Sequence, residues 1–529
     1  MSDANPPRGS VRAPRHLVAT ADHLATTGGN EMFARGGNAV DAAIAANAAI
    51  AVTGPHLCGM GGDLFALVHV DGTVFALNAA GRAGSGADAA AMRAEGLTEM
   101  PFRLDVRSVT VPGCVDGWMA LHERFGSLSL DVVLAPAQRL AAEGFPCSPL
   151  LAGLADRLDP TSRANLAELA EQASATGALI RRPGVARALD DIASGGRDSF
   201  YGGEFGAGLI ELGGGLFSAD DLATSQANWE APLSADAFGV SLHTIGPSTQ
   251  GYLALGASRL AERLPLPDDP DDERWAHLLI EAAITAGHDR PDVLHEHADG
   301  NALIAMIDAR LDEIDTERAT ERWAPDGDGD TTYLCTAGRD RDGRLMGVSL
   351  IQSNASGLGS HLVEPHTGIN LHNRGMGFSV DAGHPAEFGP GRRPPHTLAP
   401  ALATRGDDLV SVFGTMGGDA QPQILLQLAA RLFHHGHSPA LAVNAGRWAL
   451  KGPETGFDTW TAPGGPHVAV EGHAPSGWVD ALAVRGHRTA RDAGWSSGFG
   501  HAHAIVVESN GTLAGAADPR TVVGSCTGA

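Results

Sequence analysis

The spacing of hydrophobic positions along the chain changes near residue 331. Between residues 115 and 330, leucine and alanine recur at helical intervals, most clearly over 162–173, 275–286 and 303–314. After residue 331, short apolar runs alternate with glycine- and aspartate-containing turns, which predicts strands and loops, with one helix over 421–434. The pattern predicts a helix-rich part followed by a strand-rich part.

Local signals place several individual elements. The runs 64–70 and 73–78 flank Asp71-Gly72, a pair typical of a tight hairpin turn. A second hairpin is predicted from 333 to 351, and Asn38 is placed to cap an alanine-rich helix. Helices over strands, followed by strands over helices, predict an α+β layered sandwich rather than a doubly wound parallel sheet.

Composition limits the partners. The 529 residues carry a formal net charge of −25, which argues against binding to nucleic acid or to an anionic membrane surface. The longest apolar stretch, 40–54, is too short to span a bilayer, and residues 1–14 are polar and contain no secretory signal. We therefore expect a soluble, cytoplasmic protein.

The pair Thr331-Thr332 stands between an acidic, glycine-spaced stretch, 326–330, and a predicted strand. Threonine is common in β-strands, so two threonines at the start of a strand do not by themselves indicate a function. A cut before Thr331 would, however, leave a hydroxyl and a free α-amine on one residue, which is a nucleophile with its own base. An α-amine titrates near ~8, so it can accept the hydroxyl proton at neutral pH.

Three glycine clusters lie far apart, at 59–62, 357–359 and 414–418. None has the spacing of a dinucleotide fingerprint or the ending of a phosphate loop. Each predicts either an ordinary loop or a place where backbone N–H groups face a ligand.

Together with Thr331, these segments closely resemble the γ-glutamyltransferases, autoprocessing members of the N-terminal nucleophile hydrolases. The resemblance implies a four-layer αββα sandwich built from both halves of one precursor. The matching segments run nearly end to end: 35–43, 59–65, 111–113, 117–118, 246–251, 330–332, 393–394, 417–418 and 515–520.

By this resemblance the chain cleaves itself between Asp330 and Thr331. The products are a large subunit, 1–330, and a small subunit, 331–529, which stay together as a heterodimer forming one folded unit. An amide substrate then acylates Thr331, and the threonyl ester passes its acyl group to water or to an amine. No cofactor is implied.

The resemblance also implies roles for further residues. Gly417 and Gly418 correspond to the backbone donors that stabilise the oxyanion. Arg82 corresponds to the arginine that binds the substrate carboxylate, for which a guanidinium fork is well suited. Asn354 matches an asparagine near the nucleophile.

The chain departs from the family around the substrate's amine. Arg374 and Gly377 stand where γ-glutamyl enzymes carry a glutamine and the aspartate that binds the α-ammonium. His396 and Thr397 replace an expected pair of serines. We expect Arg374, His396 and Thr397 to line the substrate site. The resemblance thus implies a γ-glutamyl-type amide hydrolase or acyltransferase, or alternatively an amidohydrolase or acylase for an oxamate-like or glutaryl amide.

Other site types are weakly indicated. The five cysteines are scattered without metal-ligand spacing, and His434, His435 and His437 lack accompanying ligands, so no metal is expected. The segment 494–498 matches a serine nucleophile elbow, but too little chain follows it to supply the acid and histidine. A catalytically inactive binding or scaffold relative is a further alternative, against which the retained Thr331 argues.

Overall fold

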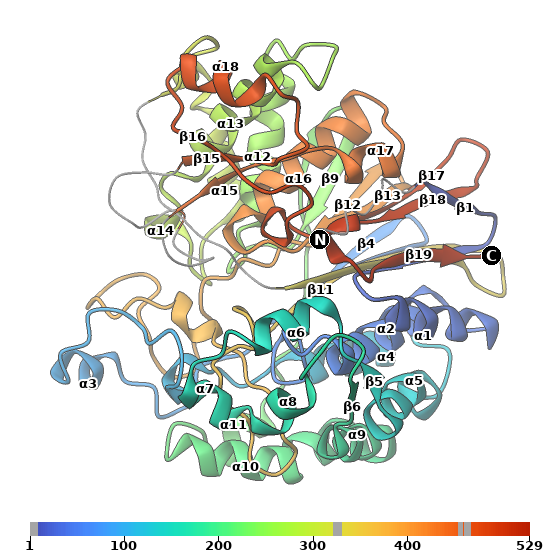
Figure 1. The fold of residues 1–529 in the computed structure, drawn as a ribbon, viewed down its shortest axis with the longest axis vertical. Helices are drawn as coiled ribbons and strands as arrows, with labels where there is room; N and C mark the ends of the chain where they lie inside the picture. Colours follow the sequence, from blue (N-terminus) through green and yellow to red (C-terminus); the bar gives the residue numbers. More distant parts are fainter. Residues whose placement is uncertain (1–8, 321–330, 453–458, 460–466) are drawn as a thin grey trace.

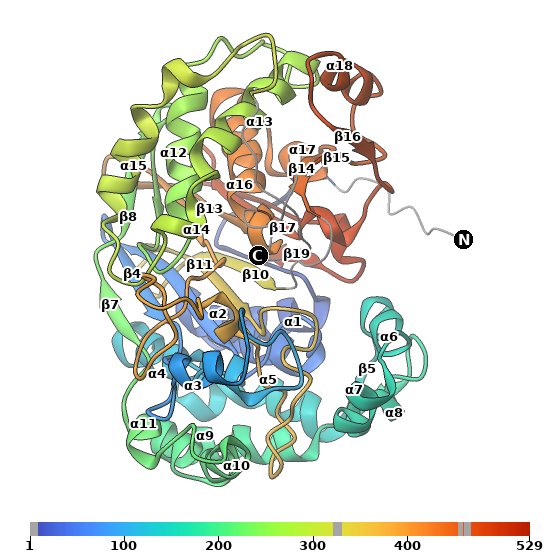
Figure 2. The same ribbon diagram turned by 90° about the vertical axis from the view of Figure 1, so that its left-hand side faces the viewer.

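The computed structural model describes residues 9–320, 331–452, 459 and 467–529. Asp330, on the other side of the predicted cleavage point from Thr331, lies outside these residues. Two seven-stranded sheets lie face to face in the middle of the molecule, and helices cover their outer faces (Figures 1 and 2). The predicted α+β four-layer sandwich is therefore confirmed.

The first sheet carries Thr331 at the start of one of its central strands, so we call it the nucleophile sheet. All its neighbouring strands are antiparallel. Its order is β19 (Ser525–Gly528), β2 (His16–Thr20), β10 (Thr332–Arg339), β11 (Leu345–Ser353), β3 (Asp63–Val70), β4 (Thr73–Ala79) and β7 (Asn228–Glu230).

The second sheet is also antiparallel throughout. Its order is β1 (Val11–Ala13), β18 (Leu513–Ala517), β17 (Ala502–Val507), β13 (Asp408–Thr415), β12 (Ala401–Arg405), β9 (Val240–Thr244) and β8 (Leu233–Ala237). Smaller sheets pair β14 (Trp448–Lys451), β15 (His467–Val470) and β16 (Thr489–Arg491), and β5 (Phe145–Pro146) with β6 (Leu179–Ile180).

Helices from both parts of the chain form the outer layers. The nucleophile sheet is covered by α1 (His23–Ala34), α2 (Ala39–Thr53) and α4 (Cys114–Phe125), with α5 (Leu130–Glu143) and α9 (Pro183–Tyr201) outside them. The second sheet is covered by α12 (Gly251–Glu262), α16 (Gln421–Ala429) and α17 (Pro439–Asn444), flanked by α13 (Glu273–Gly287), α15 (Gly300–Asp308) and α18 (Trp478–Val484).

The remaining helices are short or peripheral. They are α3 (Ala89–Ala94), α6 (Pro149–Ala155), α7 (Pro160–Asn165), α8 (Ala167–Gln172), α10 (Glu204–Gly213), α11 (Ala219–Ala223) and α14 (Arg290–Val293). None of the helices in the described part of the chain is both long and apolar enough to cross a membrane.

Three hydrophobic clusters correspond to the layers. Helix α2 is buried along its whole length between the nucleophile sheet and the outer helices. This complete burial explains why the helix is apolar on all sides and has no polar face. A second cluster lies under α12, α13 and α16. The third lies between the sheets, where Tyr333 and Val412 are fully buried. Gly414, near the end of β13, lies against the ring of Tyr333, near the start of β10, so these two strand ends lie opposite each other.

The local predictions are mostly confirmed. Both hairpins form, and Asn38 caps α2 in a reciprocal capping box with Asp41. The predicted helix 162–173 is instead two short helices, because the backbone leaves the helical region at Leu166 (φ −96°, ψ 22°). The helix-rich part also contains β7, β8 and β9, whose three to five residues are too few for periodicity to reveal.

Candidate active site

Thr331 lies at the start of β10, beside the end of β11. Its hydroxyl oxygen is 3.0 Å from Ser353 Oγ, and its side chain is fully buried. The strand register pairs Ser353 in turn with Asp63 of β3. Because adjacent strands lie about 4.8 Å apart, Thr331, Ser353 and Asp63 form a row across one end of the sheet.

The glycine loop 59–62 packs against this end of β11. Gln352 Nε2 donates to the Gly59 carbonyl at 2.6 Å, and the Asn354 side chain donates to the Pro55 carbonyl at 3.3 Å. A Cβ on Gly62 would lie 2.2 Å from the Ser353 carbonyl oxygen, so no other residue fits there. The buried amide oxygen of Asn354 has no hydrogen-bonding partner among the described residues.

The second sheet brings Gly417 and Gly418 to the same end of the sandwich. They follow β13 and precede α16, and their φ values are +142° and +52°. Backbone N–H groups at the start of a helical turn lack intrahelical partners and can face a ligand. Gln250 Nε2 donates to the carbonyls of Gly418 (2.9 Å) and Thr397 (3.1 Å), which ties this loop to the neighbouring segment.

Asp63 connects the two sheets. Its carboxylate accepts the Gly81 N–H at 2.8 Å and the His396 ring N–H at 3.0 Å, and His372 Nδ1 lies 3.3 Å away. Burial by itself would raise the pKa of Asp63, but its interactions with His372 and His396 bring that pKa below its ordinary value. Asp63 therefore stays ionised, and its bond to Gly81 positions the neighbouring Arg82.

Both ring nitrogens of His396 contact protein groups. Nε2 faces Asp63, and Nδ1 accepts the Leu398 N–H at 3.5 Å. Burial, together with the charge of Arg374, lowers the pKa of His396 to about 3, so the ring is neutral. This arrangement favours a positioning role for His396 over the direct substrate contact that the sequence predicts.

Arg374 is buried beside Thr397. Its Nη1 donates to the Thr397 hydroxyl at 3.1 Å, and burial lowers its pKa to about 10, so it remains charged. Arg290 and Asp419 form a neighbouring ion pair at 3.5 Å. The position at which the resemblance places the binding of the substrate's amine is therefore occupied by the buried, charged guanidinium of Arg374.

Arg82 shares its surroundings with a second arginine, Arg393. Arg82 donates to the Ser225 carbonyl (3.2 Å) and weakly to Asn228 Oδ1 (3.4 Å), while Arg393 Nη2 donates to the same Asn228 oxygen at 2.8 Å. Burial and then the charge of Arg82 lower the pKa of Arg393 to about 10. The structure thus adds Arg393 to the candidate carboxylate site.

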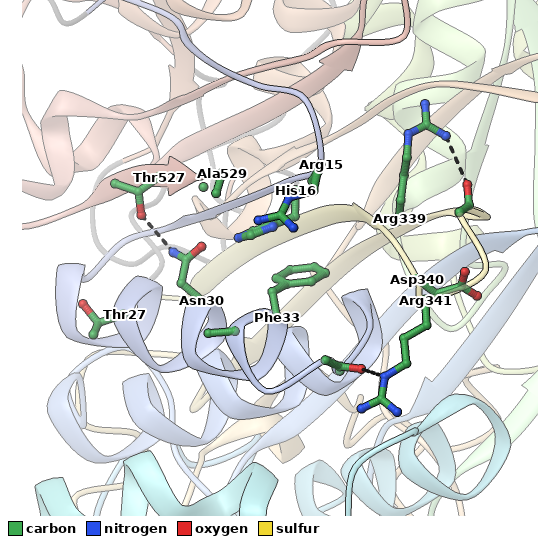
Figure 3. Close-up of a pocket in the computed structure, with 15 residues that line it drawn as sticks. Arg15, His16, Thr27, Asn30, Phe33, Arg339, Asp340, Arg341, Thr527 and Ala529 are labelled. Atoms are coloured by element: carbon green, nitrogen blue, oxygen red, sulfur yellow. Dashed lines mark hydrogen bonds between the residues drawn. The ribbon is translucent and has the colours of Figure 1, made fainter.

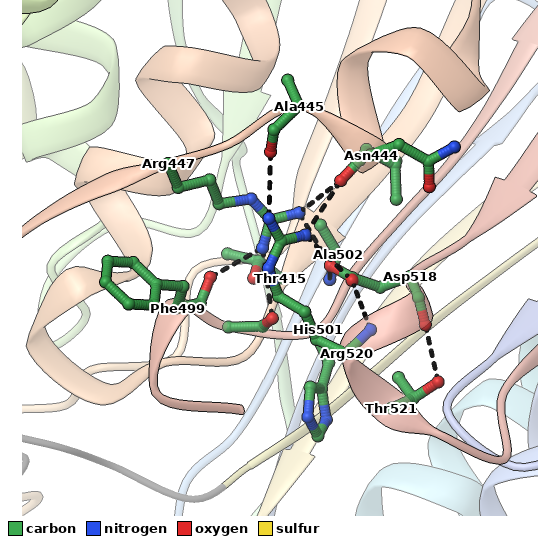
Figure 4. A network of polar contacts seen from close by, with 12 residues as sticks. Thr415, Asn444, Ala445, Arg447, Phe499, His501, Ala502, Asp518, Arg520 and Thr521 are labelled. Atoms are coloured by element: carbon green, nitrogen blue, oxygen red, sulfur yellow. Dashed lines mark hydrogen bonds and ion pairs between the residues drawn. The ribbon is translucent and has the colours of Figure 1, made fainter. Parts of the chain in front are cut away.

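A buried ionic network around Arg447, Asp518 and Arg520 packs next to the loop that carries Gly417 (Figure 4). Arg447 pairs with Asp518 at 2.7 Å and donates to the Phe499 carbonyl at 2.6 Å. Asp518 also accepts the Ala502 N–H at 2.7 Å and pairs with Arg520 at 3.0 Å. These contacts hold the segment 499–502. In this segment, the His501 carbonyl accepts a hydrogen bond from the N–H of Met416, the residue directly before Gly417. The matching segment 515–520 therefore has a supporting role that no local pattern revealed.

We expect the protein to lose stability in acid. Burial lowers the pKa of His396 and His501 to about 3 and of His503 to about 4, from 6.5. Below pH 6.5 the unfolded chain binds protons that the folded chain does not, so the free energy of unfolding falls by about 1.4 kcal/mol per pH unit for each such histidine. The Tm, measured from roughly pH 8 to 5, should fall steadily below pH 6.5.

Substitutions provide the control for this pH dependence. His501→Gln should make the decline shallower, while the exposed His23→Gln should leave it unchanged. A Tm that stays constant across this pH range would contradict the assignment of neutral buried histidines.

A cavity of about 800 Å³ lies at the opposite end of β10 (Figure 3). It is lined by α1, by Arg339 at the end of β10, by Arg341 in the turn that follows, and by residues Thr527 to Ala529. Since β10 has eight residues and is roughly 27 Å long, this cavity is separate from the row at Thr331.

Comparison with known proteins identifies the family of the chain. The family model described as Gamma-glutamyltranspeptidase matches residues 25–526. The chain is 34% identical to the oxamate amidohydrolase proenzyme of Klebsiella pneumoniae and 32% identical to the glutathione hydrolase-like YwrD proenzyme of Bacillus subtilis, in each case covering 97% of this chain and 98% of the relative.

A solved structure supports the same assignment. The cephalosporin acylase from Bacillus halodurans matches with a TM-score of 0.88 and 33% identity, over 100% of this chain and 98% of the acylase. The chain therefore belongs to the gamma-glutamyltranspeptidase family, whose members are autoprocessing N-terminal nucleophile hydrolases that process into two subunits and act on small amides.

Proposed function

We propose that Thr331 is the nucleophile of this enzyme and that the precursor cleaves itself between Asp330 and Thr331. The observation that carries the proposal is the row Thr331–Ser353–Asp63 at one end of the nucleophile sheet, together with the contact between Gly414, three residues before Gly417, and Tyr333, two residues after Thr331. Cleavage produces a large subunit, 1–330, and a small subunit, 331–529, which remain together because their strands and helices form common layers.

The chemistry proceeds through a threonyl ester. The α-amine of Thr331 takes the hydroxyl proton as the oxygen attacks the amide carbonyl. The N–H groups of Gly417 and Gly418 stabilise the oxyanion, and the leaving amine departs with the proton. Water, or an acceptor amine, then attacks the ester and releases the acid or a new amide. Asn354 follows Ser353, and its amide oxygen, which has no hydrogen-bonding partner among the described residues, lies against Gly62. We propose that this oxygen accepts a hydrogen bond near the nucleophile.

The acyl group of the proposed substrate carries a carboxylate. Arg82 and Arg393 converge on Asn228, and Gly81, next to Arg82, is bonded to Asp63 in the row that begins at Thr331. Two guanidinium groups in one corner are suited to bind a carboxylate, although Glu296 also acts on both of them.

We propose that the substrate lacks an α-ammonium and is an oxamate-like or glutaryl amide. Arg374, charged and buried against Thr397, would repel an ammonium at the position where γ-glutamyl enzymes bind one. The resemblance to the oxamate amidohydrolase proenzyme supports this choice. A γ-glutamyl substrate, and with it a role in glutathione metabolism, is the second candidate, favoured by the similarity to the YwrD proenzyme.

A substrate panel tests this choice. The processed enzyme is compared on oxamate, a glutaryl amide and a γ-glutamyl anilide, and we expect higher kcat/KM on one of the first two. Arg374→Gln should raise the relative rate on the γ-glutamyl compound, because it removes the repulsion. Efficient γ-glutamyl turnover by the unaltered enzyme would reject the proposed substrate class.

Arg82→Ala should discriminate between substrates. For amides with a carboxylate on the acyl group, we expect kcat/KM to fall roughly 10- to 100-fold, because charged hydrogen bonds are lost. Amides without that carboxylate should change little. Steady-state kinetics on a matched pair of substrates measures the difference, and the exposed Arg405→Ala is the control. Equal losses on both substrates would assign Arg82 a purely structural role.

We also propose a cytoplasmic location. All five cysteines are free and buried, as is typical of proteins that fold in a reducing compartment.

A further inference from the structure

We propose that the protein binds one divalent transition-metal ion between His277, Glu281 and His487. The three side chains meet where α13 packs against α18 and the residues that follow it. Figures 1 and 2 show α13 and α18 close together at the top of the molecule. His277 and Glu281 lie four residues apart on α13, so they share one face of the helix. His487 follows the end of α18 and faces them.

The ligand atoms are spaced for a small ion. His487 Nε2 lies 2.9 Å from His277 Nδ1 and 3.9 Å from Glu281 Oε1, and all three atoms lie within 4.8 Å of one another. Three ligands at zinc distances in a tetrahedral arrangement are separated by roughly 3.3 Å. Because the separations range from 2.9 Å to at most 4.8 Å, side-chain movements of roughly 0.5 to 1.5 Å would complete the coordination. Two histidines and a glutamate are also a ligand set that zinc uses in proteins.

Hydrogen bonds orient two of the ligands. His277 Nε2 faces the Asp315 carbonyl at 3.1 Å, so the ring proton sits there and the Nδ1 lone pair points toward the other two ligands. Thr320 donates to the Glu281 carboxylate through its hydroxyl at 2.6 Å and through its N–H. Outer partners of this kind fix the tautomer and direction of metal ligands.

The surroundings keep the imidazoles able to bind. The side chains of His487 and Glu281 are 3% and 0% exposed, and His277 is fully buried. Burial of this kind disfavours the charged form of an imidazole and so favours the neutral form that binds a metal. On binding, His487 moves its ring proton from Nε2 to Nδ1, and the coordination requires no net loss of a proton.

The position of the site indicates what the ion does. It joins residues on both sides of Thr331, and through Thr320 it reaches the segment eleven residues before that threonine. If the proposed cleavage occurs, the ion links the large subunit to the small one. The role is structural, and metal binding itself does not depend on the cleavage.

Metal titration tests the proposal. The purified full chain is stripped with a chelator and titrated with Zn²⁺, and with Co²⁺ as a spectroscopic probe. We expect one equivalent per chain, a visible Co²⁺ absorption typical of tetrahedral coordination, and a higher Tm with Zn²⁺. His277→Gln, Glu281→Gln and His487→Gln should each weaken binding by at least about 10-fold.

Controls separate this site from other histidines and from the catalytic proposal. His435→Gln and His437→Gln, in the other histidine cluster, should retain full binding, and Thr331→Ala should bind as the parent does even if it stays uncleaved. His487→Gln, at the end of a turn, serves if the α13 variants do not fold. Unchanged affinity in the three ligand variants, or no Co²⁺ band, would show a hydrogen-bonded histidine pair instead of a metal site.

Discussion

Thr331→Ala is expected to remain a single chain of 529 residues and to have no measurable turnover. The variant lacks the hydroxyl that attacks both the preceding peptide bond and the substrate amide. Loss of a catalytic nucleophile costs at least about 10⁴-fold in rate. On a denaturing gel the parent should separate into pieces of 330 and 199 residues, since 529 − 330 = 199. The same preparations are assayed for amide hydrolysis.

The neighbouring threonine provides a matched control. Thr332 is also buried, and its hydroxyl has no hydrogen-bonding partner among the described residues, so Thr332→Val keeps the shape of the side chain at little expected cost. It should cleave and turn over normally, and Thr331→Ser should retain part of both activities. Turnover in Thr331→Ala would refute the nucleophile, and a parent that stays intact after prolonged incubation would support the inactive scaffold alternative.

Gly417→Ala is expected to lower kcat by about 10²- to 10³-fold, the usual cost of losing an oxyanion donor. At φ +142° an alanine is strained, so the backbone must rotate and the N–H groups of Gly417 and Gly418 turn away from the developing charge. Because the oxyanion forms only during reaction, kcat should fall while KM changes little. Steady-state kinetics on cleaved protein separates the two parameters.

The control is an alanine substitution that strains the backbone at a glycine that supplies no N–H group to the oxyanion. Gly436 also has positive φ (+64°), and a Cβ there would meet nothing within 4 Å. Gly436→Ala should therefore lower stability by about 1 kcal/mol and leave kcat unchanged. If both variants lose activity equally, or if Gly417→Ala raises KM alone, the oxyanion assignment fails.

Local signals in the sequence were sufficient where neighbouring residues decide the structure. Asp71-Gly72 specifies a hairpin turn because both residues tolerate its backbone angles, and Asn38 caps α2 through contacts within three residues. Helix 162–173 was wrong because the break at Leu166 leaves no mark in the spacing of apolar residues.

Local signals in the sequence could not predict contacts between residues that lie far apart along the chain. Asp63 meets His396 across 333 positions, and Arg447 meets Asp518 across 71. Neither pair has a motif, since ionic and hydrogen-bonding partners are chosen by the packing of the two sheets. His277 and His487, 210 positions apart, were missed for the same reason.

The sequence by itself placed a threonine at the head of a strand and, through its family resemblance, identified the bond chemistry as amide opening through an ester. The tertiary structure decided what surrounds that threonine. Antiparallel register sets Ser353 beside it and Asp63 beside Ser353. The facing sheet brings the loop with Gly417 to the same end, and Arg374, from the loop between β11 and β12, is buried against Thr397. Register and sheet stacking depend on the whole hydrophobic core, so no local stretch of residues specifies them.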